Sequence, residues 1–192
     1  MGSMTEAAAS RQVPPAPDPV PVRLDPATTA LFVMDVTDVT CSPQPNCVEM
    51  LPRIASLITR ARAAGVLVAY TSGGAGGTPL AEVAPAPNEP VVQGRQNKFF
   101  GTNLDDIMRT HGIKTIVLAG WRANGSVLFT SHGATLLRYT VVVAVDCTAA
   151  AHDFEVAIGL YQVLNLLDGN PKNEPLKPGA VTLSKSDLIS FG

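Results

Sequence analysis

The chain has 192 residues, a formal net charge of −2, and 46% hydrophobic against 16% charged residues. This composition is typical of one compact globular domain and excludes a disordered chain. The sequence has no cluster of Lys and Arg and no apolar run of about 18 residues, so we expect neither nucleic acid nor a membrane as a partner.

The N-terminal segment differs in composition from the rest of the chain. Residues 1–24 contain MGSM, which resembles a cloning remnant, and the Pro-rich stretch VPPAPDPVPV. We therefore expect an extended arm over residues 1–24 and a single domain over residues 25–192.

The cysteine content and the start of the sequence bear on location. Cys41, Cys47 and Cys147 are an odd number of cysteines without metal-ligand spacing, so we expect reduced thiols. The sequence does not open with a charged segment followed by an apolar one, as a signal peptide would. A cytoplasmic location is the expectation.

Apolar runs alternate with amphipathic segments along the chain. In chain order, the expected elements are a strand over 29–35, a helix over 47–63, a strand over 66–71, a long loop over 72–90, a helix over 103–111, a strand over 115–119, a helix that begins near residue 126, a strand over 139–145, a helix over 152–167 and a short strand over 180–183. Strands that are almost entirely apolar indicate a parallel sheet covered on both faces. The sequence thus predicts an α/β fold, a doubly wound and mainly parallel sheet of about five or six strands with helices on both faces.

Several polar residues follow the predicted strands. In open parallel sheets the ligand binds beyond the carboxyl ends of the strands. Asp35, Thr71, the turn over 120–126 and Asp146 all lie at those ends. We expect the functional site there.

Asp35 and Ser126 are the leading candidates for chemistry. A carboxylate beside apolar strand residues is partly desolvated, which suits Asp35 to proton transfer, although an acid after a strand also commonly caps the next turn. Ser126 lies at the expected start of a helix, where N–H groups point outward. It is either a nucleophile beside an oxyanion site or a plain helix cap.

A cation for the site is sought in the stretch GRQNKFFGTNL. Lys98 is either a surface cation or a partner of Asp35, and Arg95 and Gln93 compete for the same role. The three histidines show no ligand spacing, and the glycines of TSGGAGGTP are not followed by the Lys-Ser/Thr of a phosphate loop. We therefore expect no metal and no cofactor.

Four stretches together resemble the isochorismatase-like hydrolase superfamily, also called cysteine hydrolases. They are ALFVMD, KFFGTNLDDIMRTHGIKTIVLAG, GWRANGSVLFTSHGA and VVVAVDCTAA, and the resemblance runs from about residue 29 to residue 183. It implies a doubly wound sheet, a small-molecule substrate, a homo-oligomer (dimer or tetramer) and a pocket near a subunit interface.

The resemblance also implies roles for individual residues. Amide-cleaving members use an Asp, a Lys and a Cys. Asp35 matches the Asp, whereas the family lysine falls on Gln93, with Lys98 as a possible substitute, and the family cysteine falls on Ser126. The resemblance thus implies a divergent member with two departures from the triad.

The turn before Ser126 matches the place where the family has a non-proline cis peptide bond, here Trp121–Arg122. The resemblance implies that the N–H groups of Arg122 and Ser126 face a carbonyl oxygen. Asn124 lies in the same turn and is a further binding candidate.

Aromatic residues flank the expected site in sequence. Phe99, Phe100, Trp121 and Phe129 are four of ten aromatic residues, and some of them are expected to wall the pocket and favour a flat or apolar substrate. For Phe129 core packing is the alternative.

Three functions remain open from the sequence. The first is hydrolysis of a small amide, ester or imide, with Asp35 as general acid/base and Ser126 as nucleophile or water-positioning group. The second is vinyl-ether hydrolysis of the isochorismatase type, with Asp35 as general acid and no nucleophile. The third is a non-catalytic binding or assembly protein with a degenerate triad.

Overall fold

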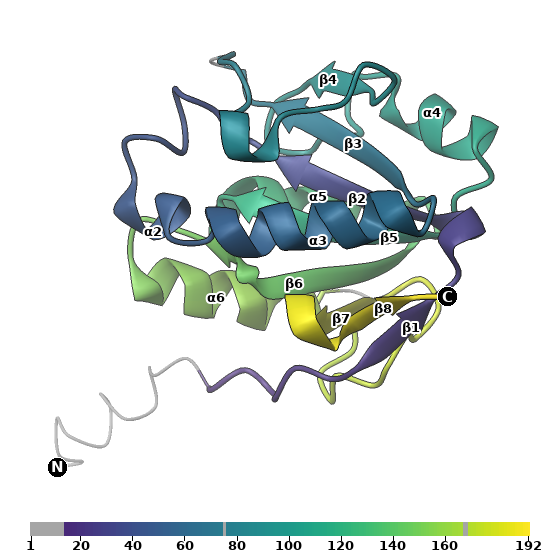
Figure 1. Cartoon of the computed structure of the whole chain (residues 1–192). Helices are drawn as coiled ribbons and strands as arrows, with labels where there is room; N and C mark the ends of the chain where they lie inside the picture. The colour runs from purple at the N-terminus through teal and green to yellow at the C-terminus, as the bar shows by residue number, and fades with distance from the viewer. Residues whose placement is uncertain (1–13, 75, 167–168) are drawn as a thin grey trace, which may run out of the picture.

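The structure, a computed structural model, describes residues 14–74, 76–166 and 169–192. Its centre is a six-stranded sheet in which all neighbouring strands are parallel and the order is β4-β3-β2-β5-β6-β7 (Figure 1). The strands are β2 (Thr29–Met34), β3 (Leu67–Ser72), β4 (Val91–Gln93), β5 (Thr115–Trp121), β6 (Thr140–Ala149) and β7 (Val181–Ser184). The predicted fold class is confirmed.

Helices cover both faces of the sheet. They are α2 (Pro45–Val48), α3 (Leu51–Ala63), α4 (Leu104–Thr110), α5 (Leu128–Leu136) and α6 (Asp153–Leu164). Figure 1 shows α3 in front of the sheet and α5 behind it. Along β2, Leu31 and Val33 pack in the core under α3, whereas Phe32 and Met34 pack in the core under α4, α5 and α6. This alternation explains why β2 is apolar throughout, because successive side chains enter different cores.

The segment expected as one helix over 47–63 forms two helices. Helix α2 ends at Val48 and α3 begins at Leu51, with Pro52 in its first turn. Proline has no N–H to donate within a helix, so it is tolerated in the first turn and not in the interior. The prediction of one continuous helix over 47–63 was therefore wrong.

A second, two-stranded sheet joins the two ends of the described chain. Strand β1 (Val22–Leu24) pairs in parallel with β8 (Ile189–Phe191). The N–H of Val20 donates to the Leu183 carbonyl at 3.0 Å, so part of the expected arm over residues 1–24 contacts the domain. Strands of three residues, such as β1, β4 and β8, carry too short a pattern to be predicted from apolar runs.

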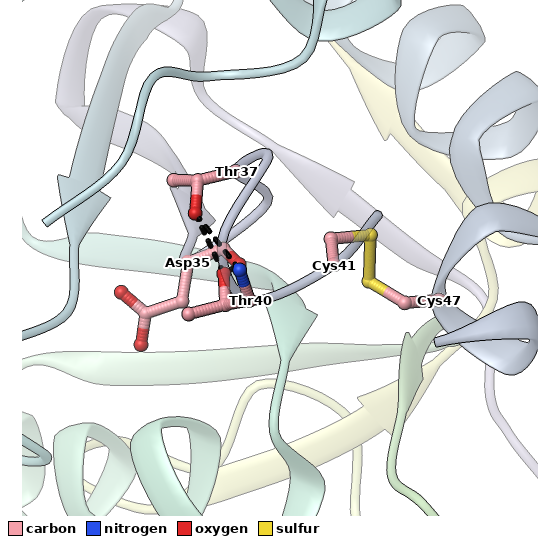
Figure 2. The surroundings of a disulfide bond; sticks show 5 residues. All are labelled: Asp35, Thr37, Thr40, Cys41 and Cys47. Atoms are coloured by element: carbon pink, nitrogen blue, oxygen red, sulfur yellow. Dashed lines mark hydrogen bonds between the residues drawn. A yellow bond between two sulfur atoms is a disulfide. The ribbon is translucent and has the colours of Figure 1, made fainter. Parts of the chain in front are cut away.

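The expectation of three reduced thiols is wrong. Cys41 and Cys47 form a disulfide bond in the segment that follows β2, and Figure 2 shows it beside the loop that carries Thr37 and Thr40. Cys147 is buried as a free thiol, and burial raises its pKa to about 12. The sequence separation of the paired cysteines gives no indication of pairing by itself.

Within the described residues, no helix has both the length and the apolar character needed to cross a membrane.

Candidate active site

Asp35 follows β2 directly, at the carboxyl edge of the sheet. Its backbone N–H donates to the Thr71 carbonyl of β3 at 2.9 Å, and the residue is only 4% exposed. Its φ is +54°, in the left-handed region that Asp adopts more readily than most residues. The carboxylate points away from the Cys41–Cys47 disulfide (Figure 2).

Lys98 is the cation that meets Asp35. Its Nζ lies 2.7 Å from Asp35 Oδ1 and 3.3 Å from the Gly94 carbonyl, and the residue is 0% exposed. Its backbone is held as well, because its N–H donates to Thr130 Oγ1 at 3.2 Å and its carbonyl accepts from Thr102 Oγ1 at 2.6 Å. Lys98 is therefore the partner of Asp35 and not a surface cation.

Ser126 provides the third member of this cluster. Its hydroxyl donates to the other carboxylate oxygen of Asp35, Oδ2, and the residue is 8% exposed. Ser126 belongs to a π-helical turn, η3 (Ala123–Val127), that leads into α5. Neither η3 nor α5 has a side-chain cap, so the reading of Ser126 as a helix cap is wrong.

Burial determines the electrostatics of this cluster. The pKa of Asp35 is raised above its ordinary value because the loss of solvent outweighs the opposing effects of Lys98 and of the hydrogen bonds from Lys98 and Ser126. A carboxylate with a raised pKa is a stronger base than an ordinary Asp. Asp35 is thus suited to accept the proton of the hydroxyl that it already contacts.

The three side chains share one cavity of about 480 Å³. Its border is mostly polar and consists of Asp35, Gly73, Gly74, Arg95, Gln96, Lys98 and Ser126. Sequence reasoning did not find Gly73, Gly74 or Gln96. The signal for the two glycines was their position just after β3, at the same edge of the sheet as Asp35.

The candidate binding residues Arg122 and Asn124 contact α6. The Trp121–Arg122 peptide bond is cis, as the family resemblance implies. The guanidinium of Arg122 pairs with the Glu155 carboxylate, and Asn124 Nδ2 lies 3.4 Å from Glu155 Oε1. Their side chains therefore engage Glu155 and not Asp35, and the oxyanion role of the turn stays a prediction.

Gln93 and Arg95 are not the partners of Asp35. Gln93 ends β4, is exposed, and borders a second cavity of about 380 Å³ that the cavity of Asp35 adjoins. Arg95 is exposed and borders both cavities.

The expected aromatic walls are only partly present. Phe99 is buried and packs against Phe32 and Tyr139, with ring centroids 6.0 and 5.7 Å apart. Trp121 is buried in the core under α3, and neither ring borders the cavity of Asp35 among the described residues. Phe100 is exposed beside the second cavity. Phe129 is 43% exposed on α5 and lies outside both cavity borders, so core packing, the alternative for this residue, was a wrong prediction.

Asp146 does not belong to the site. Strand β6 continues past it to Ala149, and its carboxylate accepts hydrogen bonds from the N–H and hydroxyl of Ser186 at 2.8 and 2.6 Å. Its position was wrongly predicted because the apolar run of β6 ends before the strand does. In the described part of the chain, no three His, Cys, Asp or Glu side chains gather as metal ligands would.

A parallel α/β sheet that holds a carboxylate, an ammonium group and a hydroxyl in one cavity at its carboxyl edge has the architecture of a small-molecule enzyme. Residues 29–165 match the family model of the isochorismatase domain, and the chain belongs to this family of hydrolases.

Individual relatives agree with this assignment. Ureidoacrylate amidohydrolase RutB from Methylobacterium radiotolerans is 28% identical over 69% of this chain and 71% of its own. The solved cysteine hydrolase from Pseudomonas syringae pv. phaseolicola has a TM-score of 0.72 at 18% identity and covers 91% of this chain and 94% of its own. N-carbamoylsarcosine amidase from Thermoplasma acidophilum has a TM-score of 0.68 at 23% identity, with coverages of 83% and 97%. At these identities the two structures show a shared fold.

Proposed function

We propose that this protein hydrolyses a C–N bond in a small organic amide, with Ser126 as nucleophile and Asp35 as general acid/base. The observation that carries the proposal is the hydrogen bond from the Ser126 hydroxyl to the buried Asp35 carboxylate, inside the cavity that both border. A nucleophile in contact with its base is the expected arrangement for covalent catalysis by a hydroxyl group.

In the proposed reaction, Asp35 accepts the proton of Ser126 as Oγ attacks the carbonyl carbon of the amide. The protonated Asp35 then gives this proton to the leaving nitrogen, the C–N bond breaks, and an acyl ester remains on Ser126. A water molecule then attacks the ester carbonyl carbon while Asp35 takes its proton. Asp35 returns this proton to Ser126 Oγ as the ester C–O bond breaks, which releases the carboxylic acid and restores the Ser126 hydroxyl and the Asp35 carboxylate. The N–H groups of Arg122 and Ser126 are the proposed donors to the oxyanion.

Lys98 is a positioning residue in this scheme. It holds Asp35 Oδ1, and this contact leaves Oδ2 for Ser126. Its charge also offsets part of the cost of burying a carboxylate. The serine needs this base more than a cysteine would, because a thiol ionises near pH 8.5 without help and a hydroxyl does not.

The names of relatives support the choice of bond, since one is called an amidohydrolase and another an amidase. A second candidate is vinyl-ether hydrolysis, in which Asp35 acts as general acid and Ser126 takes no part. The raised pKa of Asp35 favours this alternative, because it increases the protonated fraction of the carboxyl.

A panel of small amides, esters and enol ethers tests the proposal on three variants. We expect turnover of an amide by the wild type, and a loss of at least about 1,000-fold in kcat/KM for Ser126→Ala and for Asp35→Asn. Ser131→Ala is the matched control, because Ser131 is a buried serine on α5 whose hydroxyl has no partner among the described residues.

Each other outcome has a distinct meaning. Activity that survives in Ser126→Ala but not in Asp35→Asn would favour the vinyl-ether mechanism. Activity that survives in both would show that this cavity is not the catalytic site.

A further inference from the structure

The cavity of Asp35 adjoins a second cavity, and Arg95 borders both. The second cavity has a volume of about 380 Å³ and shares Gly74 and Arg95 with the first. Its border consists of Gly74, Gln93, Gly94, Arg95, Phe100, Gly101 and Thr102. Arg95 thus lies on the border of the cavity that contains Ser126 and on the border of the cavity that contains Phe100, so a substrate that extends beyond its amide group would meet Arg95 next.

Arg95 carries a positive charge that no carboxylate of the described chain balances. Lys98 is paired with Asp35, and Arg122 is paired with Glu155. Arg95, in contrast, is exposed and has no ion pair or side-chain hydrogen bond with any residue in the ranges that the structure describes. A guanidinium at the edge of a cavity is well suited to bind a carboxylate through two parallel hydrogen bonds.

Phe100 adds an apolar surface to the second cavity. It is 82% exposed, whereas its neighbour Phe99 is buried in the core. The turn that carries both is fixed, since the Phe99 N–H donates to Asn97 Oδ1 at 3.0 Å and the Phe100 N–H donates to the Asn97 carbonyl at 3.3 Å. A large aromatic ring that is held in place and left exposed at a cavity is available to contact an apolar ligand group.

We propose that the second cavity is a substrate subsite that binds a carboxylate through Arg95 and an apolar group against Phe100. The inference rests on the proposed amide hydrolysis and names its substrate class, an anionic amide with an apolar substituent. Arg95 is the residue that determines the preference for the anion.

Binding measured without turnover tests this subsite directly. In the Ser126→Ala background, isothermal titration with succinamate and with succinamide compares a carboxylate with a carboxamide of nearly the same shape. We expect succinamate to bind at least about tenfold more tightly, as for a hydrogen bond to a charged group. Arg95→Gln should remove this difference, and Arg95→Lys should restore part of it.

Two further comparisons complete the test. Arg23→Gln is the matched control, since Arg23 is an exposed arginine on β1 and lies outside the borders of both cavities. The benzyl group of 2-benzylsuccinamate should increase affinity over succinamate, and Phe100→Ala should remove only this gain. Equal affinities for succinamate and succinamide, or no binding of either at millimolar concentration, would overturn the inference.

Hydrolysis by the protein with Ser126 intact separates this inference from the function on which it rests. Arg95-dependent binding without hydrolysis of any amide would refute the proposed function and leave the subsite standing. Hydrolysis of succinamide and succinamate at equal rates, unchanged in Arg95→Gln, would support the function and refute the subsite.

Discussion

Asp35 is the residue on which the candidate site depends, because its two carboxylate oxygens have different partners. Oδ1 accepts from Lys98 and Oδ2 from Ser126, so one side chain joins segments 63 and 91 positions away. Removing either partner leaves one buried carboxylate oxygen without its hydrogen bond. The resulting destabilisation acts directly on the group that carries out the proposed reaction.

The pH dependence of activity follows from the raised pKa of Asp35. The carboxylate form accepts the Ser126 proton, so kcat/KM should rise with pH through an apparent pKa above the ordinary Asp value of 3.8. Lys98→Met removes the positive charge that lowers this pKa, so the rise should move to still higher pH.

A pH–rate profile of wild type and Lys98→Met measures both effects. A fall in activity as pH increases through this range would instead assign Asp35 the role of general acid. A shift to lower pH in Lys98→Met would contradict the ion pair as the source of the opposing effect.

The site was predictable from the sequence to different degrees at different residues. Asp35 and Ser126 followed from their places after β2 and β5, because parallel strands bring their carboxyl ends to one edge. The sequence left the partner of Asp35 open among Gln93, Arg95 and Lys98. All three lie in or beside a loop, and no periodic pattern predicts the path of a loop. Only the structure shows which side chain turns inward.

At the scale of elements, the loops that follow β2 and β3 are hydrogen-bonded to each other next to Asp35. The Asp38 N–H donates to the Thr78 carbonyl at 3.0 Å, and the Thr78 N–H returns a bond to Asp38 Oδ1 at 2.8 Å. The Thr40 hydroxyl donates to the Asp35 carbonyl, and the next residue, Cys41, forms the disulfide with Cys47 (Figure 2). The disulfide therefore links this loop, which holds the backbone of Asp35, to α2.

Removing this disulfide should destabilise the protein. We expect Cys41→Ala/Cys47→Ala to lower the free energy of unfolding by about 2 kcal/mol, because the short loop is no longer closed in the unfolded chain. Urea unfolding with and without reductant measures the effect. Reductant should destabilise the wild type and leave the double variant unchanged, and equal stabilities without reductant would contradict a bonded pair.

The contact between β2 and β5 makes a second prediction. Gly120 has a φ of +130°, and a Cβ there would lie 2.1 Å from the Met34 carbonyl oxygen. Because that oxygen is part of the backbone of the neighbouring strand, it cannot move aside. Gly120→Ala should therefore cost more than about 3 kcal/mol of stability or prevent folding.

Gly112→Ala is the matched control for this prediction. Gly112 also has a positive φ, +66°, but a Cβ there meets nothing within 4 Å. We expect a loss of only about 1 kcal/mol, from the backbone conformation alone. Urea unfolding measures the free energy of unfolding of both variants. Similar losses of stability would show that the close approach of β5 to β2 is not the reason why position 120 requires glycine.

The strands of at least four residues were predicted. The strands over 29–35, 66–71, 115–119, 139–145 and 180–183 correspond to β2, β3, β5, β6 and β7. β4 was missed because it has three residues and follows a Pro-rich loop. The break between α2 and α3 was missed because the apolar spacing continues across it, although Pro52 was the signal.

At the scale of the whole molecule, the C-terminal segment closes the fold. The Asn173 amide donates to the Leu183 carbonyl at 3.0 Å and to the Asp18 carbonyl at 2.9 Å, and β8 pairs with β1. Asp146 fixes the segment between β7 and β8 through Ser186. These contacts tie both ends of the described chain to the side of the sheet opposite β4.

Asp146 should therefore contribute to stability and not to catalysis. We expect Asp146→Ala to lower the free energy of unfolding by about 1–3 kcal/mol, because the Ser186 N–H and hydroxyl lose their acceptor. Thermal unfolding and kcat/KM on one amide, measured on the same preparation, separate the two effects. A large loss of kcat/KM with unchanged stability would place Asp146 in the site after all.

The central claim is that a serine hydroxyl and a buried carboxylate form one catalytic unit at the carboxyl edge of the sheet. Mass spectrometry of the acid-quenched protein, taken during turnover of an amide or ester, tests it most directly. An acyl group on Ser126, absent from Ser126→Ala and from Asp35→Asn, is the predicted result. Steady turnover without an acyl group on Ser126, and unchanged in Ser126→Ala, would contradict it.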